Sequence, residues 1–155
     1  MSLSPRGSKD IKMFETWFKN ISAAKANYQN AKTEEEKGDA RLVYQTISGQ
    51  IKETDKITQR AFSDYESSRA CGNPLLDIRE VLWNKDVPAY VESLRSHGVQ
   101  MFTVSSTYSS AVELYWELEK ADCHMVGMRE VFLPFTKGPF GDELEKAPAV
   151  LFSLY

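Results

Sequence analysis

Five of the six residues between positions 105 and 110 carry an aliphatic hydroxyl: Ser105, Ser106, Thr107, Ser109 and Ser110. The run follows an apolar segment and precedes a helical pattern, which places it where a strand ends and a helix begins. Helix N-termini favour anions, and open α/β sheets bind ligands at this end of their strands. These five residues are therefore the candidate ligand-binding residues.

Ordinary turn and capping chemistry is the alternative interpretation of the same run. Ser110 and Glu113 have the spacing of a capping box, and Ser106 or Thr107 could cap one turn earlier. The run contains no lysine and no glycine-rich phosphate loop, and this favours the capping interpretation over an anion site.

The other reactive side chains are few. Cys71, Cys123, His97 and His124 match no usual zinc spacing, and no G-x-S-x-G elbow surrounds a serine. Glu130 falls within an expected strand, where a solvated position is favoured over a buried one. The sequence therefore predicts no catalytic residue, no metal site and no cofactor, and favours a protein that is not an enzyme.

Residues 9–70 are predicted to be mostly helical, after a loose tail over 1–8. Apolar residues recur every three or four positions from Ile11 to Tyr28, which indicates a helix starting at Ser8 or Asp10 and ending near Ala31. A second stripe predicts one long helix over 34–69, kinked near Gly49. Gly38 and Gly49 each weaken it by about 1 kcal/mol relative to alanine. We expect an antiparallel hairpin over 9–70 whose thin apolar stripe needs another surface, such as the same helices in a homodimer.

A break at 70–74 separates this hairpin from an expected α/β unit. Residues 75–83 fit a short helix or a strand, and the Asn73-Pro74 start signal favours a helix. A helix from Asp86 to His97, a strand over 99–105, a helix over 111–122 and strands over 124–133 and 147–155 follow. The strand–helix–strand order predicts parallel pairing of the first two strands, and the last two should pair antiparallel.

The fold class predicted from these elements is α+β. A single domain over 1–155 would combine the helical hairpin of 9–70 with a βαββ-type unit over 73–155, whose small mixed sheet has three or four strands.

Composition restricts the environment and the partners. The net charge is −3, with +2 on residues 1–70 and −5 on residues 71–155, so nucleic acid is an unfavoured partner. The longest apolar runs are far shorter than the roughly 20 residues of a membrane span. Two distant cysteines and no secretory signal indicate reduced thiols in the cytoplasm.

The C-terminal half also resembles a known set of sequences. The segments are 102–110 (FTVSSTYSS) with Gly98 before it, 123–127 (CHMVG) and 145–149 (EKAPA). Over about residues 75–155 the chain resembles an uncharacterised family of small proteins from Gram-positive gut bacteria, often carried on plasmids or conjugative elements. The resemblance implies a bacterial, cytoplasmic setting and no catalytic residue.

The function expected from the sequence is a non-enzymatic interaction or regulatory module. The alternative is that residues 105–110 bind a small anion or small ligand, either for binding alone or as part of an enzymatic site. Weak nucleic-acid binding through the N-terminal helices is the second alternative.

Overall fold

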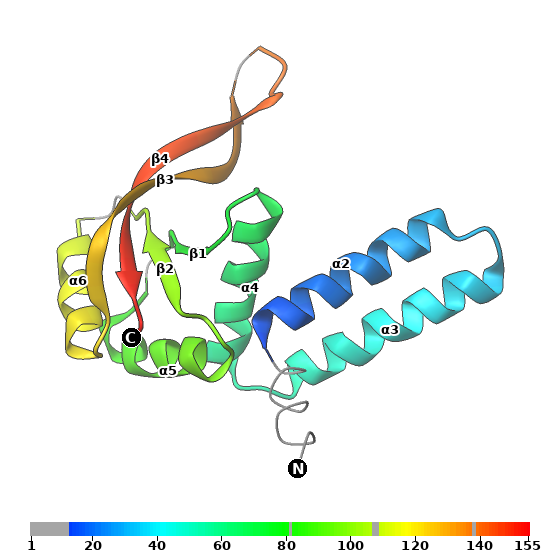
Figure 1. Ribbon diagram of the computed structural model, residues 1–155, viewed down its shortest axis with the longest axis horizontal. Helices are drawn as coiled ribbons and strands as arrows, with labels where there is room; N and C mark the ends of the chain where they lie inside the picture. Colours follow the sequence, from blue (N-terminus) through cyan, green and yellow to red (C-terminus); the bar gives the residue numbers. More distant parts are fainter. Residues whose placement is uncertain (1–12, 81, 107–108, 138) are drawn as a thin grey trace.

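The computed structural model describes residues 13–80, 82–106, 109–137 and 139–155. A central body carries two projections, the α2–α3 helical hairpin and an arm formed by β3 and β4 (Figure 1). This mixed architecture confirms the predicted α+β class. The elements in chain order are α2 (Phe14–Asn30), α3 (Glu34–Lys52), α4 (Lys56–Ala70), β1 (Leu76–Ile78), the 3₁₀ helix η1 (Asn84–Asp86), α5 (Val87–Ser96), β2 (Met101–Val104), α6 (Ala111–Lys120), β3 (His124–Lys137) and β4 (Glu143–Ser153).

The four strands form one mixed sheet in the order β1-β2-β4-β3. β1 pairs parallel with β2, and β4 pairs antiparallel with both β2 and β3. The predicted antiparallel pairing of the last two strands is therefore confirmed. The predicted direct pairing of β2 with β3 is wrong, because β4 lies between them.

Residues 75–83 contain a strand, so the helix favoured there by the Asn73-Pro74 signal is wrong. All three residues of β1 are buried. Leu76 and Ile78 belong to the apolar core, whereas Asp77 between them faces the opposite side of the sheet. Asn73 does not cap a helix, because its side chain bonds to the main chain of Phe132.

The single long helix predicted over 34–69 is also wrong. The chain leaves α3 after Lys52 and starts α4 at Lys56, where the Asp55 carboxylate accepts a 2.7 Å hydrogen bond from the Thr58 N–H. The apolar stripe runs across the break because α3 packs on α2 while α4 packs on β1 and α5. Only α2 and α3 form the hairpin, and the predicted start of α2 at Ser8 or Asp10 lies outside the described residues.

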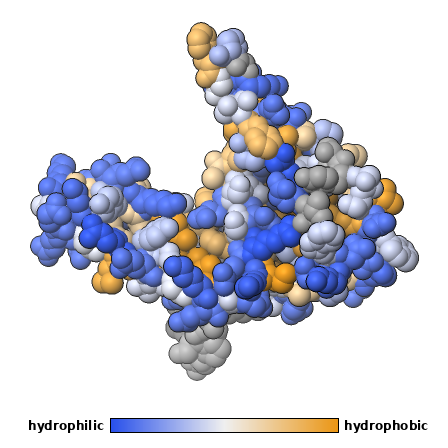
Figure 2. All heavy atoms as spheres, turned by 180° about the vertical axis from the view of Figure 1, so that it is seen from behind, coloured by the Kyte–Doolittle hydropathy of each residue, from blue (hydrophilic) through white to orange (hydrophobic). Residues whose placement is uncertain are grey.

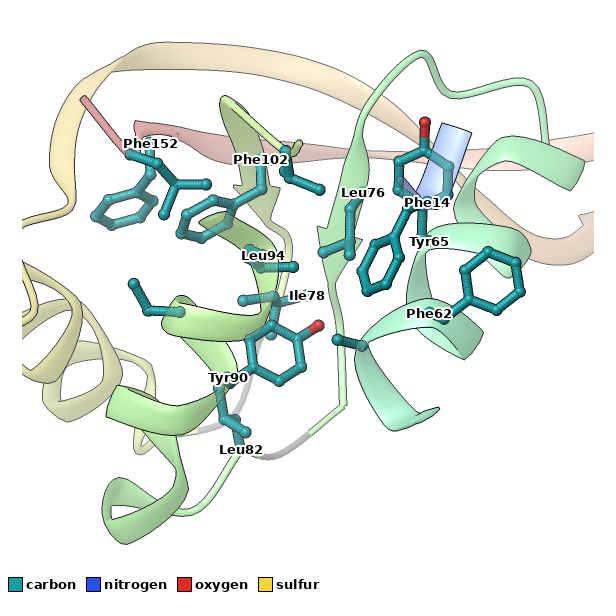
Figure 3. Close-up of a cluster of buried hydrophobic side chains, with 14 of the residues drawn as sticks. Phe14, Phe62, Tyr65, Leu76, Ile78, Leu82, Tyr90, Leu94, Phe102 and Phe152 are labelled. Atoms are coloured by element: carbon teal, nitrogen blue, oxygen red, sulfur yellow. The ribbon is translucent and has the colours of Figure 1, made fainter. Parts of the chain in front are cut away.

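The core lies between the sheet and the helices α4 and α5 (Figure 3). Phe102 and Phe152 stack across β2 and β4 with their ring centroids 5.5 Å apart. The hairpin joins this core at its base, where the Phe14 ring of α2 lies 4.8–5.7 Å, between centroids, from three rings outside its own helix. These rings belong to Phe62, Tyr65 and His97. No helix of the described chain is both long and apolar enough to cross a membrane.

The Asn73 side chain bonds the arm to the body. The buried Asn73 amide donates to the Phe132 carbonyl and accepts from the Phe132 N–H, both at 2.8 Å. The Asn73 side chain thus bonds to the outer edge of β3 as a neighbouring strand would. These two hydrogen bonds join β3 to the segment just before β1, although β1 and β3 are at opposite ends of the strand order.

The first prediction concerns this contact. Asn73→Ala should lower the free energy of unfolding by about 1–3 kcal/mol, because two main-chain groups lose their partner. Asn73→Asp, which keeps only the acceptor, should fall between that variant and the wild type. Asn27→Ala, at an exposed position of α2, is the control. Urea denaturation measures the effect, and equal stability of Asn73→Ala and Asn27→Ala would contradict the role assigned to Asn73.

Candidate functional site

The hydroxyl-rich turn does not act as one cluster. Ser105 is buried, and its hydroxyl donates a 2.5 Å hydrogen bond to the Asp77 carboxylate. Ser106 is half-buried beyond the end of β2, and Thr107 lies outside the described residues. The structure thus assigns Ser105 to the interior of the body rather than to a surface ligand.

Ser109 and Ser110 are exposed on the other side of the turn. Ser110 is the N-cap residue of α6, yet its side chain makes no capping hydrogen bond, so the capping box with Glu113 is not formed. Ser110 and Glu113 line an open hollow of about 450 Å³ together with Trp83 and Lys85. This hollow contains two of the expected components of an anion site, a helix N-terminus and a cation.

Asp77 is the polar centre of the body. Its carboxylate accepts hydrogen bonds from Thr103, at 2.6 Å, and from Ser105, and it is 7% exposed. Its main-chain N–H donates a hydrogen bond to the Ser68 hydroxyl of α4. This bond supplies a partner on the edge of β1 where no further strand pairs. Sequence reasoning missed this residue, because an acidic side chain between two apolar strand positions, as in Leu76-Asp77-Ile78, normally faces solvent, and its partners Thr103 and Ser105 are far away in the chain.

A second carboxylate lies nearby on α4. Asp64 accepts a 2.7 Å hydrogen bond from the fully buried Tyr90 hydroxyl, and Arg60 lies 3.7 Å from the same oxygen. Burial raises the pKa of both Asp64 and Asp77, against the opposing effect of their hydrogen bonds. Carboxyl groups with raised pKa values are candidates for proton transfer, so their access to a substrate decides their role.

The cavity beside these carboxylates is small. Asp64 and Asp77 line about 80 Å³ between α4, the end of β1 and the arm, together with Cys71, Arg79 and Phe132. Pockets that enclose small-molecule ligands have volumes of about 300–1,000 Å³. This cavity is smaller than such pockets, and the hydrogen bonds of the two carboxylate residues join α4, α5 and the strands.

The cysteines and histidines are not assembled into a site within the described residues. Cys71 is half-buried and Cys123 is buried, and both are free thiols. Burial raises the pKa of Cys123 to about 11, which makes it a poor nucleophile. His97 ends α5, with Nδ1 2.7 Å from the Ser93 carbonyl. The described part of the chain contains no cluster of three or more potential metal ligands.

The outer edge of β3 is the remaining candidate site, because the direction of its main-chain N–H and C=O groups can be assigned. Phe132 bonds to Asn73 on this edge, so Glu130 and Met128 direct their main-chain N–H and C=O groups the same way. The Pro148 position supports this assignment, because a proline opposite Glu130 has no N–H with which to form a ladder bond. Met128 and Glu130 are both exposed.

The second prediction concerns the buried carboxylate. Asp77→Ala should lower the free energy of unfolding by about 1–3 kcal/mol, because the Thr103 and Ser105 hydroxyls lose their acceptor. Asp77→Asn should cost less, because an amide can accept from one hydroxyl and donate to the other. Chemical denaturation near neutral pH compares the two variants, and an Asp77→Ala variant as stable as the wild type would contradict this arrangement.

The third prediction uses the raised pKa of Asp77. A carboxyl that is easier to protonate in the folded state contributes most to stability below its unfolded pKa of about 3.9. That contribution is lost as the pH rises through the folded pKa. The stability of wild type relative to Asp77→Asn should therefore fall as the pH is raised above about 4. Urea titrations over a pH series measure this difference, and a difference independent of pH would contradict the assignment.

A family model matches the C-terminal part of the chain. No curated protein and no solved structure matches the chain. The match is to a family described as a domain of unknown function, DUF7698, and it covers residues 60–154. The matched region starts within α4 and includes the sheet, α5, α6 and the arm, but not the α2–α3 hairpin. The chain therefore belongs to the DUF7698 family, with its hairpin preceding the matched region.

Proposed function

We propose that the protein is a non-enzymatic interaction module that binds an extended segment of a partner protein at the open edge of β3. The observation that carries the proposal is the pair of outward-directed main-chain positions at Met128 and Glu130. An exposed strand edge is a template for a further strand, and proteins commonly recognise peptides in this way.

The side chains around this edge favour a partly apolar partner. Met125, Val126 and Met128 are 54%, 52% and 66% exposed. Figure 2 shows apolar residues along the arm as well as at its tip. Main-chain hydrogen bonds would supply affinity, and contacts with these side chains would select segments with apolar residues at alternating positions.

Charged side chains lie beside the open edge of β3, and the edge itself is short. Glu130 lies 4.0 Å from Lys146 across the ladder, and Arg129 is exposed beside it. The Asn73–Phe132 contact ends the open edge on one side, and the register shift between Met125 and Gly127 ends it on the other. The free edge is therefore short, and it suits a segment of a few residues rather than a long strand.

The polar interior supports a binding role over a catalytic one. Asp77 and Asp64 already accept hydrogen bonds from Thr103, Ser105 and Tyr90 within the body. Their cavity is too small for a typical substrate.

The fourth prediction tests the edge with a matched pair of variants. Random heptapeptides displayed on phage and selected on the full chain should be enriched in alternating apolar residues. Glu130→Pro removes the outward N–H and should weaken binding of a selected peptide by about tenfold or more. Glu130→Ala removes the same carboxylate but keeps the N–H, and it should bind nearly as well as the wild type.

Calorimetry measures the affinities, and amide exchange locates the bound peptide on β3. Wild-type affinity of the Glu130→Pro variant would overturn the proposal, as would a selected peptide that protects no amide of β3. Circular dichroism confirms that both variants keep the fold.

The hollow beside α6 supports a second candidate function, the binding of a small anion by Ser110 and Lys85. Lys85 forms no ion pair with another described residue, and it shares the hollow with Ser110. Inorganic phosphate should then shift the amide resonances of residues 109–112 in the wild type, and Lys85→Ala should abolish the shift. Unchanged resonances in the wild type would remove this candidate.

A further inference from the structure

The outer side of α3 carries a stripe that nothing else in the described chain contacts closely. Gly38, Leu42, Gln45 and Gly49 are spaced by four, three and four residues, which aligns them on one side of the helix. The buried residues of α3, Ala40 and Ile47, lie on the opposite side against α2. Leu42 at the centre of the stripe is 63% exposed.

The two glycines have no explanation within the hairpin. A Cβ atom on Gly38 or Gly49 would meet no atom within 4 Å, and neither glycine has a positive φ. Glycine lowers the stability of a helix interior relative to alanine. What the two glycines provide is backbone without side chains on both sides of Leu42, where another helix can approach closely.

The charges along α3 indicate which helix would pack against this stripe. The first turn of α3 carries Glu34, Glu35 and Glu36, and the last turn carries Lys52. Glu34 and Lys52 are 18 residues apart, which is five helical turns, so they flank the stripe on the same side. A second α3 running antiparallel would bring each Glu34 beside the Lys52 of the other copy. A parallel second copy would bring like charges together.

We propose that α3 forms an antiparallel, two-fold symmetric interface with α3 of a second copy of this chain. The two Leu42 side chains meet near the centre, and Gly38 of each copy faces Gly49 of the other. The Glu34–Lys52 pairs close both ends, and the antiparallel helix dipoles favour the same arrangement. This interface is separate from the edge of β3 and does not depend on it.

The shape of the molecule leaves room for this arrangement. The hairpin projects from the body, and α3 lies on the side away from the arm (Figure 1). In Figure 2 the hairpin is largely hydrophilic, and an apolar patch interrupts its α3 side. Two hairpins side by side would form a four-helix arrangement with an α2 helix on each outer face and the two bodies at opposite ends.

The experiment is sedimentation equilibrium of the full chain and its variants over a range of concentrations. The wild type should form a dimer, and Leu42→Glu should raise the dissociation constant by about tenfold or more. Gly49→Ala should also weaken the dimer while it raises the melting temperature at concentrations where the chain is monomeric. Val112→Glu, at an exposed apolar position on α6, should change neither quantity.

A charge reversal tests the antiparallel register. Lys52→Glu should weaken the dimer, and adding Glu34→Lys to it should restore the affinity, because the pairs form again with opposite signs. Three results would overturn the proposal: a monomer at all concentrations, a dimer unaffected by Leu42→Glu, or a dimer strengthened by Gly49→Ala. A dimer that the double reversal fails to restore would overturn the antiparallel register.

Discussion

The hydrogen bonds around Asp77 hold in place the shortest strand of the sheet, all of whose residues are buried. β1 has only three residues, too few for its ladder with β2 to be stable alone. The Asp77 carboxylate joins the two strands through Thr103 and Ser105, while the Asp77 N–H bonds to Ser68 of α4. The sheet, the helix beside it and the hydroxyl-rich turn therefore share one buried carboxylate. The raised pKa of Asp77 is the energetic cost of that position.

The two projections are attached to this body in different ways. The hairpin is held by aromatic packing, in which Phe14 fits among Phe62, Tyr65 and His97, and by the Glu15 carboxylate of α2, which accepts hydrogen bonds from Tyr65 and Arg69 of α4. The arm is held by directional bonds, in which Asn73 pairs with both main-chain groups of Phe132. Packing fixes the hairpin only at its base, and the Asn73 contact occupies only one position of the arm. Both projections therefore leave most of their surface open to solvent.

The extent of the family match separates these two surfaces. Residues 60–154 include the arm and its open edge, so a function of β3 would be one of the family domain. The hairpin precedes the matched region, so self-association through α3 would be a property added to that domain. The body has the same role in both cases, because it fixes the directions in which the two projections leave it.

The sequence by itself determined the local features of this protein. Periodicity located α2, α5, α6 and the last two strands, because each has an apolar face at a regular spacing. The alternatives at 75–83 and the break at 53–55 were decided by tertiary structure. Burial against α4 and β2 made Leu76–Ile78 a strand despite a helix-start signal. The continuous apolar stripe was divided because α3 packs on α2 while α4 packs on β1 and α5.

The candidate site shows the same division. The sequence identified the hydroxyls of 105–110, because hydroxyl runs between a strand and a helix are visible in the chain itself. Only the fold turned Ser105 inward to Asp77 and left Ser109 and Ser110 outside. The open edge of β3 and the Asn73 contact were equally out of reach, because they depend on strand order. Strand order is fixed by contacts between residues far apart in the chain, and periodicity carries no information about those contacts.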